Sequence, residues 1–164
     1  MPAALASQGF STRPETDDDT PFLISLYAST REAELAPVPW TPEQKNAFLL
    51  HQFHAQRSHY REHIPACAFL VIEKHGAPVG RLYLEPRVTQ IHMVDIALTP
   101  DQRNRGAGSA IIQAVIDLAA AQGKGVGIFV ERFNPALNLY RRFGFTEIVD
   151  TGLYLEMEWV AQAA

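Results

Sequence analysis

The first third of the chain carries the spacing of an amphipathic helix. After a short strand over residues 10–13, the acidic run at residues 17–19 is typical of a helix N-terminus. The residues on the apolar side of the predicted helix recur every three or four positions: Phe22, Leu23, Leu26, Tyr27 and Thr30. The helix is expected to end before Pro37, because proline cannot continue it.

A second, longer helix is predicted to begin after Thr41. Thr41 is a suitable cap, Pro42 stands in the first turn, and Gln44 three residues after the cap completes a capping box. Apolar and amide side chains then continue at helical spacing toward Pro65: Phe48, Leu49, Gln52, Phe53, Gln56 and Tyr60.

From Ala66 onward the pattern changes to short runs of bulky and β-branched residues closed by turn residues, which is typical of strands. These runs predict strands over residues 68–72, 79–85, 91–98, 126–131, 145–149 and 154–159. Helical spacing returns twice, over residues 108–122 and 135–143. The order of elements implies a mixed α/β (α+β) fold with helices on both faces of one sheet.

The length and composition favour one folded domain. The 164 residues are 47% hydrophobic and 20% charged, which is typical of a globular protein. Residues 1–8 are small and unpatterned, so we expect a flexible N-terminus followed by a single domain over residues 9–164.

The charge and cysteine content narrow the functional classes. A net charge of −4, without a cluster of basic residues, argues against a nucleic-acid binder. No apolar run is long enough to span a bilayer, no signal peptide is expected at the start, and one cysteine cannot form an internal disulfide. We therefore expect a cytoplasmic protein that binds neither membranes nor nucleic acids.

Residues 94–109 contain the clearest chemical signal, a strand that leads through a glycine-containing loop into a helix. Backbone N–H groups and the helix dipole at such a loop can bind a pyrophosphate. Gly106 and Gly108 would let the phosphates approach the backbone, while Arg103 and Arg105 add positive charge. Taken alone, the loop fits a tight turn with solvated arginines equally well.

A second segment supports a phosphate-binding role for this loop. It begins at Asn134 and continues with Leu139-Tyr140-Arg141-Arg142-Phe143-Gly144-Phe145. Together with the Arg-x-x-Gly-x-Gly pattern of residues 103–108, it resembles the GNAT superfamily of N-acetyltransferases, which move an acetyl group from acetyl-coenzyme A (acetyl-CoA) to an amine. The resemblance covers residues 10–159 and departs from the family at Asn104, where glycine is frequent.

The resemblance implies a fold and a set of coenzyme contacts. The sheet is expected to be mostly antiparallel, with six to seven strands and with the parallel fourth and fifth strands splayed apart. Backbone groups of Ile96, Ala97 and Leu98 are implied to pair with the pantetheine arm as an added strand would. The remaining implied coenzyme contacts are the pyrophosphate loop and two later side chains: Arg103, Asn104, Arg105, Gly106, Ala107, Gly108, Ser109, Asn134 and Tyr140. No metal is implied.

The reaction requires a base that deprotonates the amine and an acid that gives a proton to the leaving thiolate. Tyr140 is the candidate acid, and the N–H of Leu98 is the candidate donor to the tetrahedral oxygen. Glu85 or Asp95 is the candidate base, with Glu85 slightly preferred. The direct transfer would occur in a ternary complex with a small-molecule amine.

The acceptor pocket and the assembly are less strongly indicated. Tyr27, Trp40 and Tyr83 are expected to form an aromatic wall around the acceptor, although core packing explains each of them nearly as well. The closing strands are expected to bring Tyr154, Leu155, Met157 and Trp159 to a sheet edge, which suggests a homodimer.

Two other functions compete with an acetyltransferase. A coenzyme-A-binding sensor without turnover would keep the loop, although Tyr140 argues mildly against it. A zinc hydrolase would use His59, Glu62 and His63, which match the pattern H-x-x-E-H on the second helix. Such a site needs a third protein ligand, and a solvated helix surface explains the match better.

Overall fold

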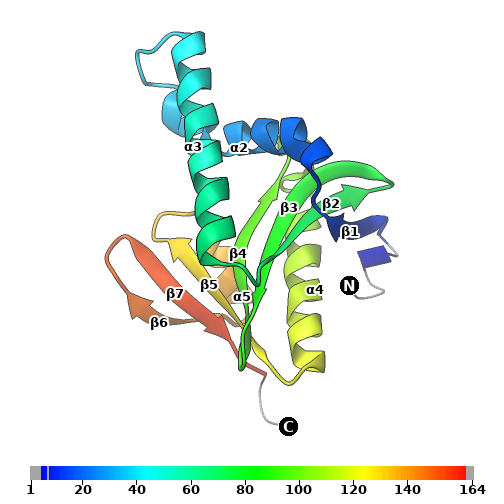
Figure 1. Cartoon of the computed structure of the whole chain (residues 1–164). Helices are drawn as coiled ribbons and strands as arrows, with labels where there is room; N and C mark the ends of the chain where they lie inside the picture. Colours follow the sequence, from blue (N-terminus) through cyan, green and yellow to red (C-terminus); the bar gives the residue numbers. More distant parts are fainter. Residues whose placement is uncertain (1–4, 7, 162–164) are drawn as a thin grey trace.

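The computed structural model describes residues 5, 6 and 8–161, and its core is a mixed seven-stranded sheet (Figure 1). The strands stand in the order β1-β2-β3-β4-β5-β7-β6. Their bounds are β1 Phe10–Pro14, β2 Ala68–Lys74, β3 Ala77–Pro86, β4 Gln90–Leu98, β5 Gly125–Glu131, β6 Thr146–Asp150 and β7 Tyr154–Trp159. Among the strands of the described residues, only β4 and β5 pair in parallel, so the sequence-based prediction of the sheet is confirmed.

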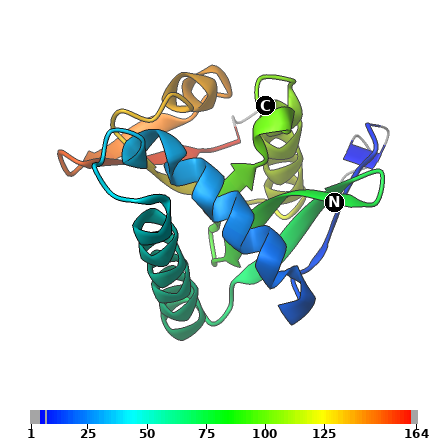
Figure 2. The same ribbon diagram turned by 90° about the horizontal axis from the view of Figure 1, so that it is seen from above.

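Helices cover both faces of this sheet, as predicted (Figure 2). The helices are α2 Thr20–Leu35, α3 Pro42–His63, α4 Ala107–Ala121 and α5 Leu137–Arg142, with 3-10 turns η1 Asp17–Asp19 and η2 Pro100–Gln102. Successive side chains of β3 point to opposite faces. Leu82 and Leu84 therefore join the core that contains α4, while the ring of Tyr83 lies on the other face, 5.9 Å from the ring of Tyr60 on α3.

The capping box at the start of α3 forms as the sequence predicts. The Gln44 N–H donates to Thr41 Oγ1 at 3.2 Å, and the Thr41 N–H donates to Gln44 Oε1 at 2.9 Å. Two otherwise unsatisfied donors are thereby bonded at an exposed helix start. The capped end of α3 projects beyond the sheet, as Figure 1 shows.

Two details differ from the expectations. β7 lies between β5 and β6 with Leu155 and Met157 buried, so the exposed edge on this side is β6 and the predicted β7 edge is wrong. Leu5 belongs to the buried core, although the unpatterned sequence predicts a loose segment there. Of the expected flexible terminus, residues 1–4 and 7 lie outside the described residues.

None of the helices within residues 5, 6 and 8–161 combines the length and the apolar character needed to cross a membrane.

Candidate active site

The two parallel strands at the centre of the sheet separate after four residue pairs. β4 and β5 pair from Gln90 with Gly125 to Met93 with Ile128, whereas β4 continues to Leu98 beside β3 alone. A register shift between β3 and β4 leaves Val94 as the extra residue where the separation begins. The predicted splay is confirmed.

The register decides which backbone groups face the opening. In an antiparallel pair, the N–H and C=O of one residue point to the same side, and this side alternates along the strand. Because the Thr99 N–H donates to the Val79 carbonyl of β3, the groups of Ala97 also point to β3. Those of Ile96 and Leu98 therefore face the opening. The expected coenzyme contacts of Ile96 and Leu98 fit this geometry, whereas the backbone of Ala97 is directed to β3 instead.

The loop after β4 ends in an uncapped helix start. No side chain of the described residues caps α4, whose N-cap Gly106 has φ of 80°. A Cβ at Gly106 would meet no atom within 4 Å, so the backbone there is open to a ligand. Asn104 has φ of 59°, a left-handed conformation that glycine favours and that asparagine tolerates better than most residues. The departure at Asn104 therefore preserves the loop conformation.

The Arg103 side chain forms hydrogen bonds from this loop to two other elements. Its Nε donates to the Leu98 carbonyl at 3.1 Å, and its Nη2 donates to the Ser29 hydroxyl of α2, also at 3.1 Å. The side chain thus holds the loop against the end of β4, and the Leu98 carbonyl already has a partner. Arg105 remains exposed in the same loop.

The two expected coenzyme contacts after β5, Asn134 and Tyr140, differ in their surroundings. The side-chain oxygen of Asn134 accepts the Ala136 N–H at 2.9 Å, which stabilises the turn before α5. Tyr140 on α5 is buried, with its ring 5.5 Å from the ring of Phe145. Burial raises the pKa of Tyr140 to about 12, and the charge of Asp95 adds to this rise. Tyr140 is therefore protonated at neutral pH and lies within electrostatic reach of Asp95.

Asp95 lies one residue after the bulge and forms an ion pair with buried Arg81. Arg81 Nη2 donates to Asp95 Oδ2 at 2.5 Å and to Gln56 Oε1 of α3 at 2.9 Å. Burial raises the pKa of the Asp95 carboxyl, while Arg81 and the Ile96 N–H oppose the rise. A raised pKa brings a carboxylate closer to the range that suits a general base.

Glu85, the other candidate base, lies farther along β3. It stands opposite His92 in the paired part of the sheet, and its Oε1 accepts from Arg87 Nε at 2.6 Å. Asp95 is the partner of Tyr83, and Glu85 lies two residues beyond Tyr83, roughly 7 Å along β3. The two candidates are thus separated, and Asp95 is the one beside the opening.

Of the three aromatic residues expected around the acceptor, Trp40 lies apart from Tyr83. Tyr83 lies under α3, Tyr27 packs edge-on against Phe53 at 6.1 Å, and Trp40 packs against Phe48 at 5.3 Å. Phe48 and Tyr60 are twelve residues apart on α3, roughly 18 Å along the axis. Trp40 therefore belongs to the projecting end of α3, away from Tyr83.

The H-x-x-E-H match remains a pair of histidines on α3. The rings of His59 and His63 lie 4.6 Å apart. Within residues 5, 6 and 8–161, no three His, Cys, Asp or Glu side chains gather closely enough to hold a metal ion.

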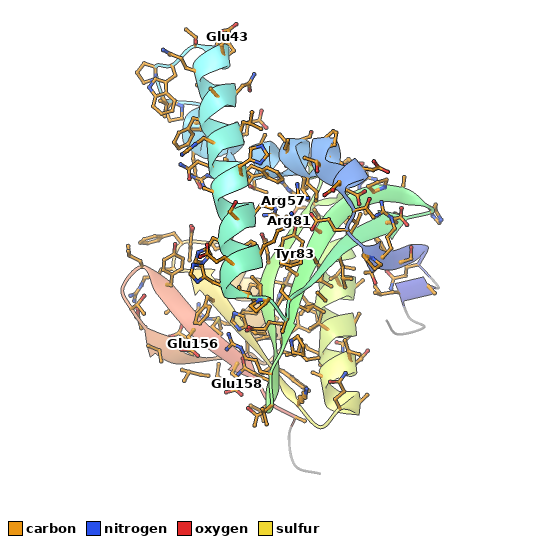
Figure 3. All side chains as sticks on the ribbon, viewed as in Figure 1. Glu43, Arg57, Arg81, Tyr83, Glu156 and Glu158 are labelled. Atoms are coloured by element: carbon orange, nitrogen blue, oxygen red, sulfur yellow. The ribbon has the colours of Figure 1, made fainter. Side chains whose placement is uncertain are left out.

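The sequence-based reading missed three polar residues under α3 and along β4. Arg81 is 4% exposed and His92 is 5% exposed, and Arg57 of α3 lies beside the Arg81 side chain in Figure 3. The available signal was a charged or ionisable residue inside an otherwise apolar strand, at Arg81 and at His92.

Within the described part of the chain, the His92 imidazole is neutral and lacks a hydrogen-bond partner at one of its nitrogens. Its Nδ1 is buried without a hydrogen-bond partner among the described residues, and its ring lies 4.8 Å from the ring of Phe129. Burial lowers the pKa of His92 to about 4; Arg87 adds to this effect, and Glu85 opposes it. Between pH 6.5 and 4 the unfolded chain therefore binds a proton at this site that the folded chain does not.

Acidification is expected to destabilise the protein through His92. Because the folded pKa lies below the unfolded one, the contribution is complete above pH 6.5 and is lost as the pH falls toward 4. From pH 7 to pH 5 the free energy of unfolding is expected to fall by about 2 kcal/mol through this group. Urea unfolding at both pH values should show this loss in wild type and in His51→Leu, an exposed control, but not in His92→Leu. Equal losses in all three proteins would contradict the assignment.

A sequence model of the acetyltransferase (GNAT) family matches residues 25–145, which include the opening, the loop and α5.

Curated relatives match parts of the chain. A mycothiol acetyltransferase of Clavibacter michiganensis subsp. michiganensis is 38% identical over 85 residues, which cover 51% of this chain and 28% of the relative. An N-alpha-acetyltransferase of Sulfurisphaera tokodaii is 31% identical over 98 residues, which cover 49% of this chain and 58% of the relative. The matches thus span less than two thirds of either relative.

Solved structures share the fold over nearly the whole chain. The PaiA N-acetyltransferase from Thermoplasma acidophilum, in complex with coenzyme A, superposes with a TM-score of 0.70 at 14% identity, covering 93% of this chain and 99% of that one. The ribosomal-protein-S18-alanine N-acetyltransferase from Escherichia coli gives 0.61 at 17% identity, covering 94% and 96%. At these identities the likeness concerns the fold alone.

Proposed function

The chain belongs to the acetyltransferase (GNAT) family, and from that premise we propose that it moves the acetyl group of acetyl-CoA directly to an amine of a small molecule in a ternary complex. The observation that carries the proposal is the opening between β4 and β5, which meets the uncapped start of α4 at its wide end. An added strand and a pyrophosphate thus have adjacent places to bind.

Acetyl-CoA suits this arrangement at three points. The N–H groups of residues 103–109 and the positive end of α4 would bind the pyrophosphate, and Arg105 would add charge. The backbone of Ile96 would pair with the pantetheine arm, while Leu98 would contribute only its N–H, to the acyl oxygen, because its carbonyl is bonded to Arg103. Asn134 would approach the arm from the β5 side through its amide nitrogen, because its oxygen already caps the turn.

The proposed chemistry is a nucleophilic attack of the amine nitrogen on the thioester carbonyl. Asp95 takes the amine proton, and the N–H of Leu98 donates to the tetrahedral oxygen. When the intermediate collapses, the carbon–sulfur bond breaks and Tyr140 gives its proton to the departing thiolate. Products are then the N-acetylated amine and free coenzyme A.

The assembly proposed with this function is a homodimer. Every residue of edge strand β6 is exposed, and the half-exposed Ile148 and Val149 give it apolar contact area. An unpaired edge of this kind favours association with a second copy. Light scattering that gives a mass near 18.2 kDa at working concentration would contradict the dimer.

Acetyl-CoA is expected to raise the melting temperature of the wild-type protein, and Gly108→Glu is expected to abolish the rise. A carboxylate at residue 108 would stand where the phosphates bind, so the roughly 2.7 kcal/mol expected at a hundredfold excess over the dissociation constant would be lost. Thermal unfolding with and without acetyl-CoA measures the effect.

The matched control for this experiment is Gly108→Ala. A Cβ at residue 108 would lie 3.9 Å from Leu98 Cδ1, an ordinary contact, so the alanine variant should fold. Its methyl group carries no charge, so Gly108→Ala should keep more of the shift than Gly108→Glu. An unchanged shift in Gly108→Glu would remove the loop from the binding site. The absence of any shift in wild type, together with no release of thiol from acetyl-CoA in an amine screen, would overturn the proposed function.

A further inference from the structure

A small cavity under α3 lies beside the proposed base. It lies between α3 and the strands β2 and β3. Three arginines and one carboxylate line it: Arg57, Arg61, Arg81 and Glu15. Figure 3 shows Arg57 and Arg81 beside Tyr83, between α3 and the sheet. Because Arg81 is bonded to Asp95, the cavity is one guanidinium away from the carboxylate that would accept the amine proton.

Several donors at this cavity have no acceptor. The Nε and Nη2 atoms of Arg57 and the Nε atom of Arg81 are buried without a hydrogen-bond partner among residues 5, 6 and 8–161. Leaving a buried donor unbonded is costly, and the cost is larger for charged groups. Three such donors around one cavity favour an external acceptor there.

The charges around the cavity point to an anion. Asp95 balances Arg81 on the sheet side, and Glu15 accepts from the Tyr83 hydroxyl at 3.0 Å. The carboxylate nearest to Arg57 is Asp17, at 3.6 Å, and the Asp17 side chain is 96% exposed. An ion pair with so exposed a partner is screened by solvent and holds Arg57 weakly. Arg57 thus has no buried counter-ion among the described residues.

The walls of the cavity select a small, flat anion. Arg57 lies 5.9 Å from the ring centre of Phe53, and Arg81 lies 5.1 Å from that of Tyr83, so the aromatic rings fix both guanidinium groups. The space among the lining residues admits a group of about one water molecule. One carboxylate oxygen fills a space of this size, and a planar carboxylate matches the two donors of a guanidinium.

Resting on the proposed function, we propose that the Arg57–Arg81 cavity binds a carboxylate of the acceptor. The acceptor is then a small amine that carries its carboxylate a few bonds from the amino group, such as an amino acid. With its carboxylate on Arg57 and Arg81, its amine reaches Asp95 and the thioester. Arg57 is a specificity-determining residue in this arrangement, because it binds the acceptor and does not touch the reacting atoms.

The first test measures binding without turnover. Calorimetric titration with propionate, at an ionic strength matched with chloride, is expected to detect binding to wild type, while propionamide does not bind. Arg57→Gln should weaken propionate binding at least tenfold. Arg132→Gln removes the same charge from an exposed ion pair with Asp150 and should bind propionate like wild type. Absence of propionate binding, or equal binding by Arg57→Gln, would overturn the proposal.

The second test measures acceptor choice by thiol release from acetyl-CoA. Matched pairs differ only in the carboxylate: glycine with glycinamide, and β-alanine with β-alaninamide. Wild type should prefer the carboxylate member of at least one pair by tenfold or more in kcat/KM. Arg57→Gln should raise KM for that member about tenfold, with kcat and the amide acceptors little changed.

The outcomes separate this proposal from the proposed function. Turnover of acceptors without any preference for a carboxylate, or with a preference that Arg57→Gln leaves intact, overturns the arginine cavity and leaves the acetyltransferase standing. Failure of every acceptor together with failure of acetyl-CoA to bind overturns both.

Discussion

Asp95→Asn is expected to lower turnover by roughly 10² to 10⁴-fold, the range that a positioned general base contributes. The asparagine keeps the size of the side chain and can still accept a hydrogen bond from Arg81, but it cannot take a proton. The rise of kcat/KM with pH that ionisation of Asp95 gives the wild type should also disappear. Steady-state thiol release across pH measures both effects.

The same change is expected to destabilise the fold, because Arg81 keeps its buried charge without a counter-ion. Breaking a buried ion pair on one side costs about 3 to 5 kcal/mol, and the remaining hydrogen bond reduces this cost. The double variant Asp95→Asn/Arg81→Gln removes both charges and should recover stability without recovering turnover. Recovery of turnover in the double variant would show that Asp95 acts only through the fold.

Tyr140→Phe is expected to lower turnover by roughly 10²-fold, the lower end of the contribution of a general acid. The phenylalanine keeps the ring and its contact with Phe145, so acetyl-CoA affinity and thermal stability should change little. The effect is limited because a free thiol has a pKa of only about 8.5, and its thiolate already leaves readily. Turnover measured across pH tests the expected loss of activity, and calorimetry tests whether the affinity for acetyl-CoA is unchanged.

Wild-type turnover in Tyr140→Phe would assign the proton to solvent or to another group, and Tyr140 would then be a packing residue of α5. A parallel loss of turnover and of coenzyme affinity would instead place its hydroxyl in binding.

Local patterns predicted most of the fold. The Thr41 capping box, the strand runs and the left-handed Gly123 that ends α4 each depend on residues close together in the sequence. The position of β7 between β5 and β6 did not follow from them, because a hairpin has two strands and either one can pair with the rest of the sheet. Buried Leu155 and Met157 mark the inner strand only once the sheet is assembled.

The candidate site was predictable where it follows a motif and not where it depends on register. Residues 103–109 and Tyr140 were indicated by the two motifs that carry the resemblance to the family. The bond between Arg81 and Asp95 joins residues on neighbouring strands across a bulge, and one inserted residue decides which side chains face each other. For the same reason, the sequence could not show whether Asp95 or Glu85 lies beside the opening. It also could not show that the backbone groups of Ala97 point to β3. Arg57 comes from a third element, whose packing on β3 has no local signature.

The short pairing of β4 with β5 bears on how long the protein survives in a cell. Only four residue pairs of the described chain join β4 to β5, so the amides of these pairs should exchange with solvent more readily than amides deeper in either half of the sheet. Proteases cleave such transiently opened forms in proportion to their population. With acetyl-CoA bound in the gap as proposed, backbone bonds would be added between β4 and β5 and would suppress this opening. Degradation of the chain is therefore expected to slow when acetyl-CoA is abundant and to accelerate when it is scarce, which would couple enzyme abundance to the supply of its own substrate.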